Sequence, residues 1–107
     1  MLIKVPGIEV GPFHYSVISD AESDRELGDR QLYGDCSHML RRIRVASDTS
    51  REQFTCTFLH EAIEAINNVW CNDKMEHALI TNVAYGLAQM CRGLGIEFYA
   101  DQSPHYL

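Results

Sequence analysis

The sequence has few of the features that assign a chain to a class by composition alone. None of its apolar runs approaches the roughly 20 residues that a membrane-spanning helix needs. Residues 1–7 show neither the basic and apolar regions nor the small-residue cleavage site of a secretory signal. We therefore expect a soluble cytoplasmic protein that makes no contact with a membrane.

Paired cysteines and basic residues are also scarce. The four cysteines are widely scattered without a C-x-x-C pair, so we expect neither a cysteine-ligated zinc site nor a disulfide framework. Nine Lys and Arg stand against 15 Asp and Glu, a formal net charge of -6, which argues against direct nucleic-acid binding. In the one basic cluster, Arg42 and Arg44 alternate with Ile43 and Val45, which predicts a half-buried strand with a basic outer face.

The rest of the composition predicts one small α+β domain over residues 1–107. At 46% hydrophobic residues, the chain can bury one modest core, and a second domain does not fit. A polar, charged stretch at residues 20–30 is expected to be a loop or a short helix. Aromatic and β-branched residues predict strands at residues 13–19, 32–36 and 40–45.

Helical spacing predicts two long helices after the strands. The first should run over residues 50–70, with Ser50 or Thr49 as its cap, and the second from about Met75 to Leu94, ended by Gly95. Their short connection predicts an antiparallel pair, packed against a small antiparallel β-sheet. The predicted buried stripes are Leu59, Ile63, Ile66 and Trp70 in the first helix and Leu79, Val83, Leu87 and Met90 or Cys91 in the second.

The most informative motif is His60-Glu61-Ala62-Ile63-Glu64, on the first of these helices. Residues four apart lie on one face of a helix, so His60 and Glu64 can converge on one metal ion. Glu61 lies about 100° round the helix and would flank that ion. In zinc peptidases with an H-E-x-x-H motif the flanking Glu is the general base, which makes Glu61 the candidate catalytic residue.

A third metal ligand is expected from the second helix. Catalytic zinc sites usually have three protein ligands plus water, and two His with one Glu are a known set. His77 supplies the second imidazole, whereas its neighbour Glu76 points about 100° away. The prediction is therefore Zn2+ held by His60, Glu64 and His77, with Asn67 a further candidate on the same face. The same donors also suit non-haem iron.

The motif alone also fits a solvated helix face in an acid-rich chain. Its setting in the apolar run of residues 54–70 argues against this, because a His and two Glu there must be exposed, paired or ligated. If the protein is a hydrolase, an oxyanion could be stabilised by one of four residues among which the sequence does not choose, Tyr33, His38, His14 or Tyr85. The tail at residues 102–107, with His105, is expected to be a disordered end without a role.

The order of these motifs resembles that of small phage and prophage proteins similar to the ImmA/IrrE-type zinc metallopeptidases. Glu64 stands in place of the second His of the family motif, with His77 at the position of a downstream His in the short members. The family fold is a small β-sheet against an active-site helix and a second ligand-bearing helix. The likeness is carried by Tyr33-Gly34-Asp35-Cys36, Arg42-Ile43-Arg44-Val45, residues 57–67, Glu76-His77 and residues 84–90.

This resemblance implies a zinc ion and hydrolysis of a peptide bond by metal-activated water. The expected function is that of a zinc-dependent, metallopeptidase-like phage or prophage protein in the cytoplasm of a bacterial host. Its substrate or partner would be a protein, such as a repressor or a host protein. Because the second His is missing, a catalytically inactive interaction module on the same fold, with or without metal, is the alternative. Mimicry of nucleic acid by the acidic surface is disfavoured by the nine basic residues.

Overall fold

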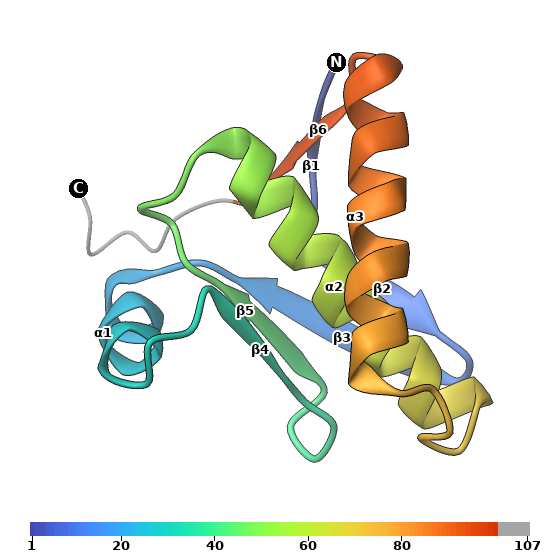
Figure 1. Ribbon diagram of the computed structural model, residues 1–107. Coiled ribbons are helices and arrows are strands. Elements are labelled where there is room, and N and C mark those ends of the chain that lie inside the picture. The colour runs from blue at the N-terminus through green and yellow to red at the C-terminus, as the bar shows by residue number, and fades with distance from the viewer. Residues whose placement is uncertain (101–107) are drawn as a thin grey trace.

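The predicted strands and helices are present, and three short strands that the sequence did not predict join them (Figure 1). The computed structural model describes residues 1–100, so the tail with His105 lies outside the described residues. In chain order the elements are β1 (Leu2–Lys4), β2 (Gly7–Val10), β3 (Phe13–Ile18), α1 (Ala21–Asp29), β4 (Gly34–Ser37), β5 (Arg42–Val45), α2 (Arg51–Trp70), α3 (His77–Gly93) and β6 (Glu97–Tyr99).

The main sheet has four strands in the order β2-β3-β5-β4. The pairs β2/β3 and β4/β5 are antiparallel, whereas β3 and β5 are parallel, with Ser16 opposite Arg42. The prediction of an antiparallel sheet was therefore wrong. The chain leaves β3, passes through α1 and β4 and enters β5 in the direction of β3, and only such a crossover can pair two strands in parallel. β1 and β6 form a separate parallel pair, each too short to show an alternating pattern.

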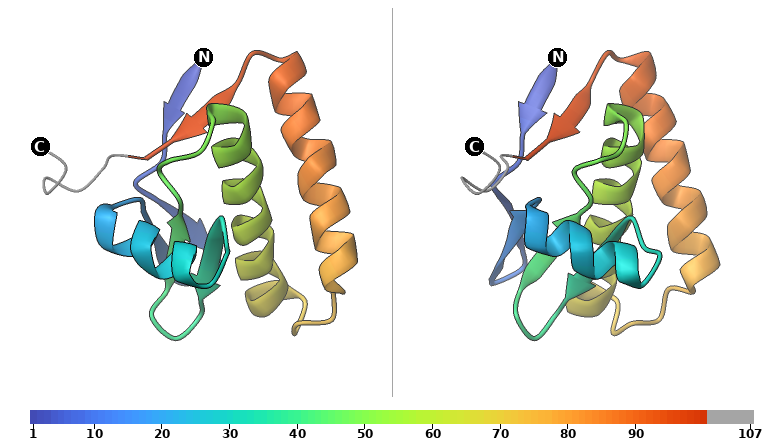
Figure 2. Two further views of the ribbon diagram at one scale, coloured as in Figure 1. Left: turned by 60° about the vertical axis from the view of Figure 1, so that its left-hand side comes forward. Right: turned by 90° about the vertical axis from the view of Figure 1, so that its left-hand side faces the viewer.

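Helix α2 lies between the sheet and α3 (Figures 1 and 2). Its cap is Ser50, whose Oγ accepts a hydrogen bond from the Gln53 N–H at 3.1 Å. Because α2 is packed on two sides, its buried residues do not form the single predicted stripe. Ile63 is buried, but Ile66 is exposed and Trp70 is 68% exposed. The main core, under α2, contains Val5, Val10, Tyr15, Val17, Ile43, Val45, Phe54, Phe58 and Ala65.

Helix α3 packs against α2 through Ile80 and Ala84, which are buried with Ile63. The predicted stripe of Leu79, Val83, Leu87 and Met90 or Cys91 was wrong, because the first four residues are exposed and Cys91 is only half-buried. Within residues 1–100, α2 is the one element with which α3 makes extensive contact. The rest of the α3 surface is therefore left uncovered by the other elements. None of the helices in this described part is long and apolar enough to cross a membrane.

Helix α1 packs beside one end of the main sheet, against β5. Ile43 and Val45 of β5 face the core, as predicted, but Arg44 does not lie on an open basic face. It is buried, and its guanidinium donates two hydrogen bonds to Asp35 of β4, at 2.9 and 2.6 Å. It also forms an ion pair with Glu26 of α1. The neighbouring helix thus turns the predicted solvated strand face into a buried ion pair.

Candidate metal centre

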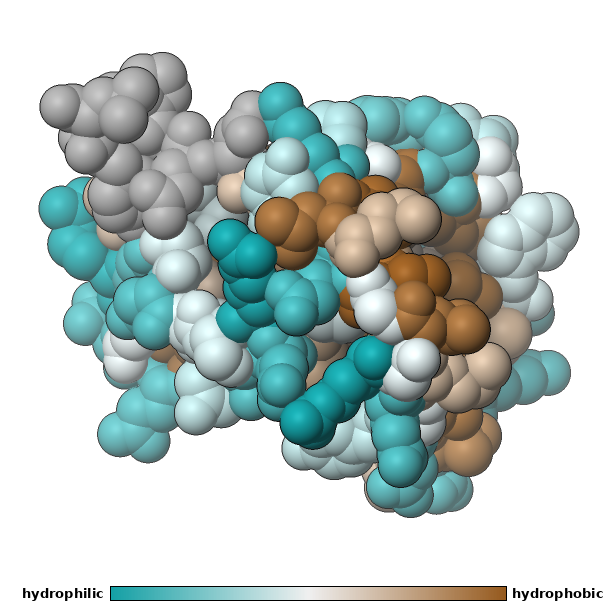
Figure 3. Space-filling view, turned by 90° about the horizontal axis from the view of Figure 1, so that it is seen from above, coloured by the Kyte–Doolittle hydropathy of each residue, from teal (hydrophilic) through white to brown (hydrophobic). Residues whose placement is uncertain are grey.

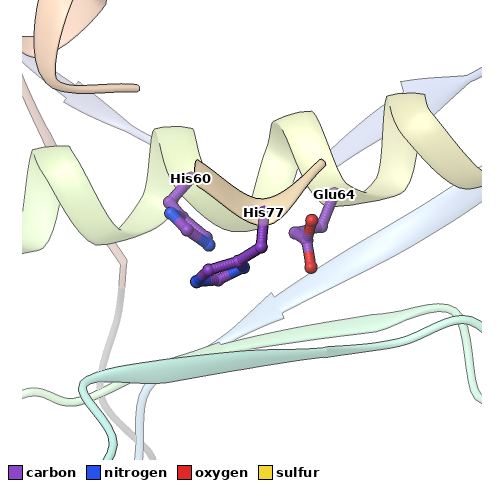
Figure 4. Close-up of side chains that lie close together, drawn as sticks. All are labelled: His60, Glu64 and His77. Atoms are coloured by element: carbon purple, nitrogen blue, oxygen red, sulfur yellow. The ribbon is translucent and has the colours of Figure 1, made fainter. Parts of the chain in front are cut away.

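His60, Glu64 and His77 converge, as the sequence predicted. His60 and Glu64 lie one turn apart on α2, and His77 is the first residue of α3. Each offers a ligand atom, and these three atoms lie within 4.8 Å of one another (Figure 4). The two imidazole centroids are 5.0 Å apart. Zinc ligand distances of about 2.0–2.2 Å require donor atoms a little over 3 Å apart, so small side-chain rotations would close the set around one ion.

The turn between the helices brings His77 back to His60. Asn72 and Asp73 both have positive φ angles, 51° and 58°, which Asn and Asp adopt more readily than most residues. The backbone N–H of Asp73 then donates to the carbonyl of Asn67 at 2.9 Å. The helix pair therefore reverses direction within a few residues, and the first turn of α3 lies beside the centre of α2.

Asn67 fixes this turn and does not belong to the ligand set. Its side chain is buried, with Oδ1 accepting from the Met75 N–H at 2.9 Å and Nδ2 donating to the Met75 carbonyl at 3.2 Å. Both hydrogen-bonding groups of the amide thus hold the backbone two residues before His77. Glu76, which the sequence set aside, is the N-cap residue of α3 and is exposed.

The three candidate ligands line a cavity of about 470 Å³ between α2, α3 and β4. Glu61, the candidate base, lines the same cavity and is 8% exposed. Of the four candidate oxyanion residues, Tyr33 and Tyr85 also line it. The other two lie elsewhere: His38 contacts Tyr15 Oη at 3.3 Å, and His14 contacts Glu9 at 2.6 Å on the surface.

Carboxylates give this cavity a negative character. Burial, with the charges of Glu64 and Asp35, raises the pKa of Glu61 to about 8. Burial and the charges of Glu61 and Glu64 likewise raise the pKa of Cys36 to about 12, so this thiol stays protonated at neutral pH and is a poor nucleophile. Burial lowers the pKa of His60, which favours the neutral imidazole that binds metal. A bound cation would favour the ionised forms of Glu61 and Cys36. It would also bind the neutral imidazole of His60.

β4 closes the cavity because a glycine lets it approach α2. A Cβ on Gly34 would lie 2.5 Å from Thr57 Cγ2 of α2 and 2.8 Å from the Arg44 carbonyl oxygen of β5. The same Cβ would be 3.5 Å from Glu61 Cγ. Gly34 therefore sets how closely the edge strand covers the candidate base.

No protein-family model, curated protein or solved structure matches the chain. The centre is therefore interpreted from its own chemistry. Two imidazoles and one carboxylate, of which His60 and Glu64 are half-buried and His77 is exposed, form a group that could hold a metal ion beside this cavity.

Two further cavity residues escaped the sequence analysis. Thr57 and Thr81 both line the site, one on each helix. Helical spacing predicts that Thr81 lies at the site. His77, Thr81 and Tyr85 recur every four residues and so share one face of α3. Once His77 is chosen as a ligand, that spacing assigns the other two to the same cavity.

Proposed function

We propose that this protein is a zinc-dependent hydrolase of the metallopeptidase type, with His60, Glu64 and His77 as the metal ligands. The observation that carries the proposal is the convergence of these side chains from two helices. They are separated by up to 17 positions in the sequence, and only the turn held by Asn67 brings them together. The chemistry that zinc supplies when bound is Lewis acidity and a water whose pKa is lowered to about 7.

Glu61 is the proposed general base. It follows the ligand His60 directly and faces the same cavity, where burial limits competition from bulk water. A nearby dication would favour the ionised form of this carboxyl, which is the form that accepts a proton. Tyr33 or Tyr85 would donate a hydrogen bond to a developing oxyanion, since both side chains line the cavity.

The cavity has room for a substrate larger than water. It shares Gln53, Cys56 and Tyr85 with a second cavity of about 680 Å³. The second cavity lies between the N-terminal half of α2, the C-terminal half of α3 and β6. A continuous depression along the helix pair suits an extended chain, and this favours a peptide over a small metabolite as substrate.

Metal content is the first test of the proposal. Purified without a histidine tag or added metal, the wild type should contain about one zinc per chain by elemental analysis. The His60→Ala variant should contain none. His14→Ala is the matched control, because His14 lies on the surface against Glu9, and it should keep the metal. A folded wild type that neither contains zinc nor takes it up would contradict the proposal.

Cleavage separates a hydrolase from a metal-binding module. We expect the wild type to cleave members of a library of quenched fluorescent peptides. Glu61→Gln should lower kcat at least about 100-fold while zinc content stays the same, because the amide cannot accept the proton. Zinc binding without cleavage of any peptide would favour the interaction module. Cleavage that survives Glu61→Gln unchanged would refute the assignment of the base.

A further inference from the structure

Helix α3 leaves an apolar face uncovered. We call Leu79, Val83, Gly86, Met90, Gly93 and Leu94 the α3 face, since they lie within an arc of about 100° on the helix. Leu79 is 50% exposed, Val83 38% and Met90 63%. Figure 3 looks along α3 from its C-terminal end and shows apolar residues, in brown, over the middle and right-hand part of the view. The face points away from the metal centre, because His77 and Thr81 lie on the other side of α3.

The α3 face carries no charge, in a chain whose formal net charge is -6. Between His77 and Gly93 there is no Asp or Glu, and the only Lys or Arg is Arg92. Arg92 lies off the face and is 3.6 Å from Glu52 of α2. Two copies of an acidic protein repel each other over most of their surfaces, so a surface without carboxylates is where they can approach. A charged partner would find no group to pair with there.

Gly86 and Gly93 lie in this face, and no close contact within residues 1–100 requires a glycine at either position. Glycine is less favourable than alanine in a helix, so it is expected where something approaches closely. Apart from the neighbouring residues and the nearby backbone of α3 itself, nothing in residues 1–100 lies within 4 Å of a Cβ built on Gly86 or on Gly93. Neither glycine has the positive φ angle found at Gly95, where the helix has ended. The space beside both glycines is free for another chain.

The spacing within the face is self-complementary in an antiparallel pair. Leu79 and Gly93 each lie seven residues from Gly86, and Val83 and Met90 lie three and four residues from it. With Gly86 beside the two-fold axis, Leu79 of each copy packs over Gly93 of the other, and Val83 packs against Met90. We infer that the α3 face is the interface of a homodimer, in which two α3 helices cross antiparallel with Gly86 against Gly86.

The expected interface is small. A helix of 17 residues is about 25 Å long at a rise of 1.5 Å per residue. A pair of such helices buries on the order of 1,000 Å² in total, an area that is typical of weak, transient interfaces. The dimer should therefore form in the micromolar range, and both metal centres should remain open.

Sedimentation equilibrium of the wild type, from about 1 to about 500 μM, tests the inference, because this range spans the expected dissociation constant. We expect a monomer–dimer equilibrium. Met90→Asp should raise the dissociation constant at least about 100-fold, because two unpaired carboxylates would be buried in each dimer. Gln89→Asp adds the same charge on the adjacent position, which is outside the face, and should change the constant far less. Circular dichroism should show that both variants keep the fold, since both positions are exposed.

Gly86 gives a test that does not depend on added charge. Gly86→Ala should raise the melting temperature of the monomer, because alanine favours the helix, while raising the dissociation constant of the dimer. Gly86→Cys should form a disulfide-linked dimer on oxidation faster than Gln89→Cys or the wild type. A wild type that stays monomeric at about 500 μM, well above the micromolar dissociation constant expected here, would overturn the inference. So would a dimer insensitive to Met90→Asp, or equal cross-linking of the two cysteine variants.

Discussion

Asn67 shapes the candidate metal centre without being one of its three candidate ligands. Its amide holds the backbone of Met75 through two hydrogen bonds, and His77 follows two residues later. In Asn67→Ala, two backbone groups of the half-buried Met75 lose their partner, so the free energy of unfolding should fall by about 1–3 kcal/mol. Zinc affinity should fall roughly 10-fold or more, because His77 is no longer held towards His60. Urea unfolding of the metal-free protein and zinc competition titration would measure the two effects.

The neighbouring Asn68 offers a matched control. Its side chain makes only exposed hydrogen bonds, to Asp73 at 3.2 and 3.4 Å. Asn68→Ala should therefore change stability by less than about 0.5 kcal/mol and leave zinc affinity unchanged. Equal losses in the two variants would show that Asn67 does not position the site.

The sequence predicted which side chains converge better than it predicted the residue that positions them. His60 and Glu64 are related by helix geometry alone, and His77 was the one imidazole early in the next helix. Asn67 lies on the same face and was taken for a possible metal contact. Its true partner is the backbone of Met75, eight residues away across a turn, and no periodicity encodes such a contact.

At the level of elements, β4 depends on Gly34 for its place against α2. A methyl group there would meet Thr57 and the backbone of β5 at distances below 3 Å. Gly34→Ala should therefore lower the free energy of unfolding by about 1–3 kcal/mol as β4 shifts away from α2. The shift would also widen the cavity around Glu61, so cleavage should fall more than zinc content. Chemical unfolding and elemental analysis of the variant would check both expectations.

Gly28 in α1 is the control for this substitution. A Cβ on Gly28 would meet nothing within 4 Å in the described residues. Gly28→Ala should therefore stabilise the protein by about 0.5–1 kcal/mol, because alanine is favoured inside a helix. If both alanine variants were equally stable, the close approach of β4 to α2 would not be what determines its position.

The two long helices show where hydrophobic periodicity stops being informative. The cap at Ser50 and the breaks after Trp70 and before Gly95 predicted their ends well. The buried faces were predicted less well, because α2 packs on two sides and α3 on one. An apolar stripe marks a surface that favours burial but does not name its partner. In α3 the stripe with Leu79 and Met90 stays exposed within residues 1–100.

For the whole molecule, the ion pair of Arg44 joins three elements and makes stability depend on pH. The hydrogen bonds and charge of Arg44 lower the pKa of Asp35 in the folded protein below its ordinary value of 3.8. The unfolded chain therefore binds a proton more readily at this residue. The stabilisation by Asp35 is fully present above about pH 4 and is lost as the pH falls through the folded-state pKa.

Asp35→Asn should remove this dependence. At pH 7 the variant should be less stable by about 3 kcal/mol, because Arg44 keeps only Glu26 as a charged partner in a buried setting. Urea midpoints measured between about pH 6 and 3 should fall more steeply for the wild type than for the variant. Asp29→Asn, at the exposed end of α1, is the control and should follow the wild type. Parallel curves for the wild type and Asp35→Asn would mean that acid unfolding begins elsewhere in the molecule.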